Sequence, residues 1–107
     1  MIEERIRRIG ENEALYRQVN EQVRGINRGV SEFTVLCECG TLDCMAHIDV
    51  SRNVYEETRS SSHRFIVLPG HQIDELEIVV ADHGSFIVLE KTPPQARRIA
   101  EEMNPRT

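Results

Sequence analysis

Three cysteines within eight residues carry the clearest chemical meaning in this sequence of 107 residues. They stand in the string Cys-Glu-Cys-Gly-Thr-Leu-Asp-Cys over residues 37–44. Side chains two positions apart on an extended segment point to the same side, so Cys37 and Cys39 can reach one ion. Gly40 allows a sharp turn with backbone N–H groups available to sulfur, and Cys44 returns on the second arm. Three thiolates at this spacing indicate a soft site for zinc or for iron–sulfur chemistry.

A closed tetrahedral site needs a fourth ligand, and the sequence has no fourth cysteine. His71 follows Pro69-Gly70, a pair typical of a type II turn, which would hold the imidazole in a fixed direction. His47 follows Cys44 by three residues, a spacing suited to a helix or turn, but in a strand it would face away.

We therefore predict a metal site with one principal set of ligands, Cys37, Cys39, Cys44 and His71, and with His47 as the alternate fourth ligand. The other candidates for the fourth position are His83, Asp43, Glu38 and water. The competing interpretation is that the cysteines are unrelated buried residues that pack as small apolar side chains.

Further motifs accompany the cysteines. The string Cys-x-Cys-Gly-x-x-x-Cys is followed by Arg64-Phe65, Pro69-Gly70-His71 and Val88-Leu89-Glu90-Lys91, and preceded by Asn12-Glu13-Ala14-Leu15 and Val19-Asn20-Glu21. Together these motifs resemble a family of small uncharacterised proteins from actinobacteria over residues 12–91. The resemblance implies that His71 accompanies the cysteines, and it implies no known activity.

A looser likeness is to CDGSH-type iron–sulfur domains, which also use Cys-x-Cys, a third cysteine and one histidine. In this sequence Cys44-Met45-Ala46-His47 stands in place of their Cys-Asp-Gly-Ser-His, and the spacings are shorter. This likeness implies an iron–sulfur cluster as the alternative cofactor, with a redox function.

The N-terminal segment, residues 1–28, is predicted to be helical because apolar residues recur at spacings of three and four. They form two stripes, Ile2, Ile6 and Ile9, and Tyr16, Val19, Val23 and Ile26. Gly10-Glu11-Asn12 interrupts the pattern, and Asn12 is suited to cap a second segment. We therefore expect a kink or two helices.

From Ser31 onward the apolar period changes to two, which is typical of strands. Residues 33–39 and 44–50 are predicted to form a hairpin with the cysteines at its tip. The later elements are a helix from Ser51 to about Arg59, a central strand over residues 64–68, a hairpin of residues 76–81 and 86–90, and a final helix after Thr92-Pro93. The predicted class is α+β, with a small, mainly antiparallel sheet.

The chain is short enough that we expect a single domain over residues 1–107, comprising a helical segment (1–28), a metal-binding α+β core (30–91) and a C-terminal helix and tail (92–107). With 13 basic residues against 18 acidic ones, a net charge of −5 and no Trp, the composition disfavours nucleic acid as a partner. The first 29 residues nevertheless carry six Arg against five acids, so a zinc-dependent nucleic-acid-binding module is retained as an alternative.

No signal-like start or membrane-length apolar run is present, so we expect a cytoplasmic protein with reduced thiols. No residue pattern indicates a catalytic site. The preferred function is a small structural-zinc module that binds a protein partner or regulates one, through the N-terminal helical segment, with a homo-oligomer left open.

Overall fold

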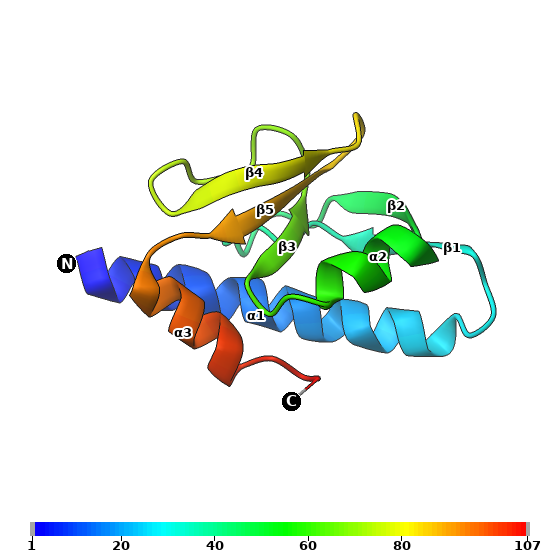
Figure 1. Ribbon diagram of the computed structural model, residues 1–107, viewed down its shortest axis with the longest axis horizontal. Coiled ribbons are helices and arrows are strands. Elements are labelled where there is room, and N and C mark those ends of the chain that lie inside the picture. The colour runs from blue at the N-terminus through cyan, green and yellow to red at the C-terminus, as the bar shows by residue number, and fades with distance from the viewer. Residues whose placement is uncertain (1, 107) are drawn as a thin grey trace.

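The computed structural model describes residues 2–106, so Met1 and Thr107, the ends of the predicted segments, lie outside the described residues. The elements follow in the order α1 (Ile2–Ile26), β1 (Glu32–Leu36), β2 (His47–Ser51), α2 (Arg52–Arg59), β3 (Arg64–Val67), β4 (Glu77–Asp82), β5 (Ile87–Lys91) and α3 (Pro94–Glu102). Two small antiparallel sheets, β1-β2 and β3-β5-β4, share the chain with these helices. In Figure 1, α1 runs the length of the molecule beneath both sheets. The predicted α+β class is confirmed.

Helix α1 continues through the predicted break as one helix, so the expectation of two helices is wrong. Gly10 faces α3, where a Cβ atom would lie only 2.9 Å from Cγ2 of Ile99. The glycine therefore allows two helices to approach each other closely. The Asn12 side chain caps no helix and instead donates to the carbonyl of Gly40 over 3.0 Å.

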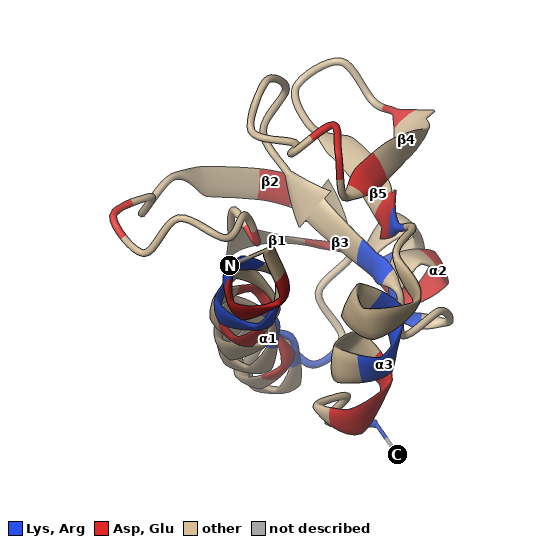
Figure 2. Ribbon diagram, turned by 90° about the vertical axis from the view of Figure 1, so that its left-hand side faces the viewer, with Lys and Arg blue, Asp and Glu red and all other residues tan. Residues whose placement is uncertain are grey.

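The buried face of α1 also differs from the second predicted apolar stripe. Val19 and Ile26 are 36% and 83% exposed, whereas Glu13, Arg17 and Asn20 are buried. Each of these polar side chains has a polar or charged partner within reach. Their burial is therefore tolerated, since polar groups in protein interiors are stable when they are paired. Figure 2 shows basic and acidic residues mixed along α1. Among the described residues, no helix combines the length and apolar character needed to cross a lipid bilayer.

The hairpin of β1 and β2 confirms the predicted alternation, with Val35 opposite Ile48 and both side chains buried. The ladder extends beyond the strands, since the N–H of Cys37 donates to the carbonyl of Ala46 over 2.9 Å. The loop between the cysteines therefore forms the tip of this hairpin. Helix α2 begins as predicted, after Ser51, whose hydroxyl accepts from the N–H of Val54.

Strand β3 lies at the edge of its sheet, with β5 in the middle, so the prediction of a central strand over residues 64–68 is wrong. Its apolar character on both faces has another cause. The N–H of Glu38 donates to the carbonyl of Ile66 over 2.8 Å, and the N–H of Ile66 donates to the Glu38 carboxylate over 2.9 Å. The segment between the first two cysteines thus covers the free edge of β3.

Helix α3 begins one residue later than predicted, with Pro93 as its N-cap. Thr92 still belongs to the sheet region, because its N–H donates to the carbonyl of Leu76 over 3.0 Å. The hairpin of β4 and β5 forms as predicted, and Gly84 in its turn has a φ of 85°.

A cluster of three buried charged side chains joins α1 to the β4-β5 hairpin. Nζ of Lys91 lies 2.8 Å from Oε1 of Glu13 and 2.7 Å from Oε2 of Glu77. Burial raises the pKa of Glu13 well above its usual value; Lys91 opposes this rise, and a hydrogen bond with Glu77 adds to it. Burial therefore favours the neutral form of the Glu13 carboxyl in this group.

We expect the free energy of unfolding to fall as the pH rises above the usual pKa of a glutamate, because the unfolded chain then loses the Glu13 proton while the folded protein, with its raised pKa, retains it. Glu13→Gln mimics the protonated carboxyl, so this variant should match wild type at pH 5 and exceed it at pH 8 by about 1 kcal/mol or more. Urea unfolding at both pH values measures the difference.

Glu77→Gln is the matched control, because the Glu77 carboxylate accepts from the N–H of Ile73 over 2.7 Å as well as pairing with Lys91. It should destabilise the protein at both pH values. A Glu13→Gln variant that loses stability at pH 8 would contradict the assignment of the proton to Glu13.

Candidate metal centre

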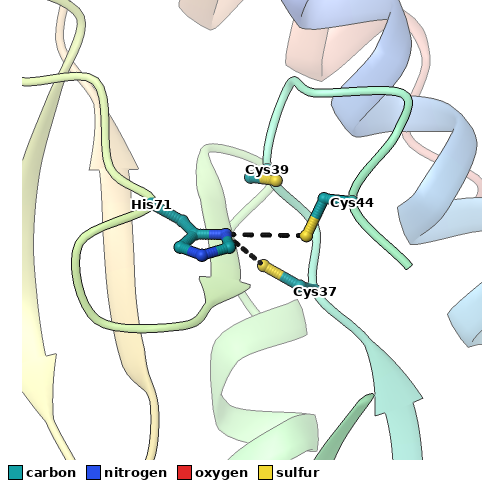
Figure 3. A group of neighbouring side chains, drawn as sticks. All are labelled: Cys37, Cys39, Cys44 and His71. Atoms are coloured by element: carbon teal, nitrogen blue, oxygen red, sulfur yellow. Dashed lines mark hydrogen bonds between the residues drawn. The ribbon is translucent and has the colours of Figure 1, made fainter. Parts of the chain in front are cut away.

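The structure brings Cys37, Cys39, Cys44 and His71 together at the tip of the first hairpin. One ligand atom from each of these residues lies within 4.8 Å of all the others. Figure 3 shows the three sulfurs on one loop and the imidazole approaching from a second loop. Nδ1 of His71 lies 3.6 Å from Sγ of Cys37 and 3.5 Å from Sγ of Cys44.

The two distances from the His71 nitrogen match those of a tetrahedral metal site. With zinc–sulfur bonds of about 2.3 Å and zinc–nitrogen bonds of about 2.0–2.1 Å, tetrahedral angles place nitrogen and sulfur about 3.6 Å apart. The two distances from His71 Nδ1 to the Cys37 and Cys44 sulfurs agree with this value within 0.1 Å. The residues present therefore fit a tetrahedral ion.

Helix α1 positions the cysteine loop through close packing. A Cβ atom on Gly40 would lie 2.6 Å from Cγ2 of Ile9 and 3.4 Å from its Cα. Any larger residue at this position would push the loop away from the helix. Gly40 is thus required for close approach, in addition to the turn expected from the sequence.

Helix α1 also holds the loop by hydrogen bonds from one side chain per turn. Asn12 donates to the carbonyl of Gly40, and the Tyr16 hydroxyl donates to the carbonyl of Leu42 over 2.6 Å. Asn20 bonds both backbone groups of Leu36, donating to the carbonyl over 2.9 Å and accepting from the N–H over 2.8 Å. The three side chains, spaced four residues apart, fix the segment that carries all three cysteines.

The turn that carries His71 is built as the sequence predicts. Gly70 has a φ of 88°, and the N–H of His71 donates to the carbonyl of Leu68 over 3.1 Å. The N–H of Leu68 in turn lies 3.3 Å from Sγ of Cys37, as a donor to the sulfur. The turn is therefore attached to the same cysteine that its imidazole faces.

Burial controls the protonation of the sulfurs. It raises the pKa of Cys37 to about 12, against a backbone hydrogen bond from Leu68 that lowers it. Burial also raises the pKa of Cys39, against a backbone bond from Thr41. Without a cation this burial disfavours the thiolate form of both residues and hence a reactive dithiol, and a metal ion that binds here would have to displace their protons.

The other candidates for the fourth ligand lie outside this group. His47 begins β2 and is exposed, on the side opposite the core. Glu38 is fully buried and pairs with Arg59, and His83 stacks on Phe86 with ring centroids 4.7 Å apart. Asp43 is exposed on the loop. Among residues 2–106, the three cysteines with His71 are the one cluster of this kind that could hold an ion.

Sequence reasoning missed the side chains that hold the loop. Asn12 was expected to cap a helix, Tyr16 to belong to an apolar stripe, and Glu38 to be a candidate ligand. The available signal was the spacing of four residues between Asn12, Tyr16 and Asn20, which places three hydrogen-bonding side chains on one face of a helix.

No protein-family model matches the chain, and neither a curated protein nor a solved structure does.

Proposed function

We propose that Cys37, Cys39, Cys44 and His71 bind one Zn²⁺ and that this ion is structural. The observation that carries the proposal is the distance of 3.5–3.6 Å from the imidazole nitrogen to two sulfurs. Three sulfurs and one imidazole are a common ligand set of structural zinc sites. Four protein ligands leave no position for a reacting water, which argues against a metal-dependent hydrolase.

The proposed ion would join two parts of the fold that belong to different sheets. The cysteines lie on the loop between β1 and β2, and His71 lies on the turn after β3. Zinc at this point would fix one sheet against the other, in a chain whose core is small. Such binding energy contributes directly to folding, because the unfolded chain has no preformed site.

Two alternatives are less well supported. In the likeness to CDGSH-type domains the imidazole ligand is His47, which lies outside the cluster. A nucleic-acid interface on α1 would use Arg17 and Arg24, but Arg17 is buried and donates to the carbonyls of Ser62 and Ala100. Arg24 is paired with Glu56 over 2.7 Å.

We further propose that the zinc-stabilised protein binds a protein partner through α1, in the cytoplasm. The outward face of this helix carries Leu15, Val19 and Ile26, which are 51%, 36% and 83% exposed. An exposed apolar stripe on a helix supports a contact with another apolar surface. The likeness to the actinobacterial family rests on motif residues with structural roles here, including Asn12, Asn20 and Lys91.

Metal analysis of untagged protein, purified without chelator, tests the zinc proposal. We expect about one equivalent of zinc per chain and no visible absorption, because Zn²⁺ has a filled d shell. A coloured protein that contains iron and inorganic sulfide would establish the cluster instead. Less than about half an equivalent of any metal would overturn both interpretations.

A further inference from the structure

A hollow remote from the metal centre opens where α1 ends and α2 begins. It has a volume of about 580 Å³. We name this hollow the arginine groove. It is lined by Arg24, Gly25, Arg28, Gly29, Val30, Ser31, Arg52 and Asn53. None of these residues belongs to the Cys3His cluster. Figure 1 shows the end of α1, from which the chain turns toward β1, and the lining residues 24–31 belong to this part of the chain.

The arginine groove carries strong positive charge in a protein whose net charge is −5. Three guanidinium groups line it and no carboxylate does. Arg24 is paired with Glu56, but within residues 2–106 neither Arg28 nor Arg52 forms an ion pair. The lining therefore holds two positive charges that no carboxylate of the described chain balances.

Arg52 is held in place before any ligand arrives. Its Nε donates to the carbonyl of Val30 over 2.9 Å, and its Nη2 donates to the carbonyl of Asn27. Its guanidinium carbon lies 5.2 Å from the ring centroid of Phe33. These contacts leave Nη1 free to donate and lower the entropy that an ordered ligand contact would cost.

The volume and the donors together define the ligand class. Hollows of about 300–1,000 Å³ are typical of sites for small molecules. Guanidinium groups match the geometry of phosphate oxygens and bind them with two parallel hydrogen bonds. No aromatic ring lines the groove, so nothing there would stack on a base. The acidic residues mixed along α1 interrupt the basic surface that a nucleic-acid strand would need (Figure 2).

We propose that the arginine groove binds the phosphate group of a small molecule, either inorganic phosphate or a phosphate ester. Arg28 is the exposed donor, and Arg52 is the donor that is already held in place. This inference is independent of the zinc proposal, because the two sites share no residue.

Titration of the isotope-labelled protein, as purified, with inorganic phosphate, pyrophosphate and AMP, followed by NMR at low ionic strength, tests the proposal. We expect saturable shifts of the Gly25, Gly29 and Ser31 amides, with potassium chloride at equal ionic strength giving none. Tighter binding of AMP than of inorganic phosphate would identify an ester as the ligand class, and the reverse would identify the free ion.

Arg28→Ala should weaken phosphate binding about tenfold, because it removes one charge-assisted contact. Arg28 is exposed, so the fold should survive this change. Arg98→Ala is the matched control, because it removes the same charge from an exposed position on α3, outside the groove. The proposal would be overturned if the two variants weakened phosphate binding equally, or if chloride caused the same shifts as phosphate. It would also be overturned if an RNA oligonucleotide bound more tightly than phosphate and shifted amides along α1.

Discussion

Replacing His71 by alanine will lower the free energy of unfolding of the zinc-loaded protein by about 3–4 kcal/mol. This is the stabilisation that bound zinc provides when its free concentration is roughly 100 to 1,000 times the dissociation constant. The same change will have almost no effect in the presence of a chelator. The His71 side chain is exposed, and its imidazole contacts the sulfurs of Cys37 and Cys44. Without an ion, such a surface position contributes within about 0.5 kcal/mol.

Urea unfolding of wild type and His71→Ala, each with buffered free zinc and with chelator, separates the two contributions. His47→Ala is the matched control, because His47 is also an exposed histidine near the cysteine loop but lies outside the cluster. It should behave as wild type in both conditions. A loss for His71→Ala that is the same with and without chelator would show that the imidazole acts through packing rather than through a metal.

The geometry of the cysteine loop was predictable because it follows local rules. Cys37 and Cys39 are two residues apart on an extended segment, and the Pro69-Gly70 pair specifies the turn that aims His71. The position of this turn beside the loop could not be derived in the same way. It depends on the pairing of Glu38 with Ile66, two residues far apart in sequence, whose contact no periodicity encodes.

The buried polar residues show where pattern reasoning fails. Periodicity rules assign apolar side chains to the core, and for Ile6, Ile9 and Tyr16 this is correct. The same rules place no charged residue of a helix in the core, yet Arg17 is buried with its guanidinium 4.8 Å from the ring centroid of Phe65. A buried ion or amide is stable only beside a specific partner, and a single sequence does not indicate which distant residue that partner is.

The buried ion pair beside the cysteines carries the second large expected effect. The side chains of Arg59 and Glu38 are 2% and 0% exposed, and their closest atoms lie 2.6 Å apart. The Glu38 carboxylate also accepts from the side chain of Asn20 over 2.8 Å and from the N–H of Ile66. Its charge is fully compensated only while the guanidinium of Arg59 is present.

Arg59→Met keeps most of the volume and leaves the Glu38 carboxylate buried without a counter-ion. We expect the zinc-loaded protein to lose about 3–5 kcal/mol, the usual cost of removing one partner from a buried pair. Because Glu38 lies between Cys37 and Cys39, zinc affinity should also fall about tenfold or more, as it does when groups that orient metal ligands are removed. Urea unfolding and competition with a zinc chelator measure the two effects.

Two further variants determine whether the loss comes from the unpaired charge. Arg5→Met removes one partner of the exposed pair between Arg5 and Glu75, whose side chains are 48% and 70% exposed, and should cost less than about 1 kcal/mol. Adding Glu38→Leu to Arg59→Met removes the stranded carboxylate and should restore part of the stability. If the free energy of unfolding of the double variant is instead lower than that of Arg59→Met, the Glu38 carboxylate contributes mainly through its hydrogen bonds to Asn20 and Ile66. The segment between the cysteines would then be held by those hydrogen bonds rather than by the ion pair.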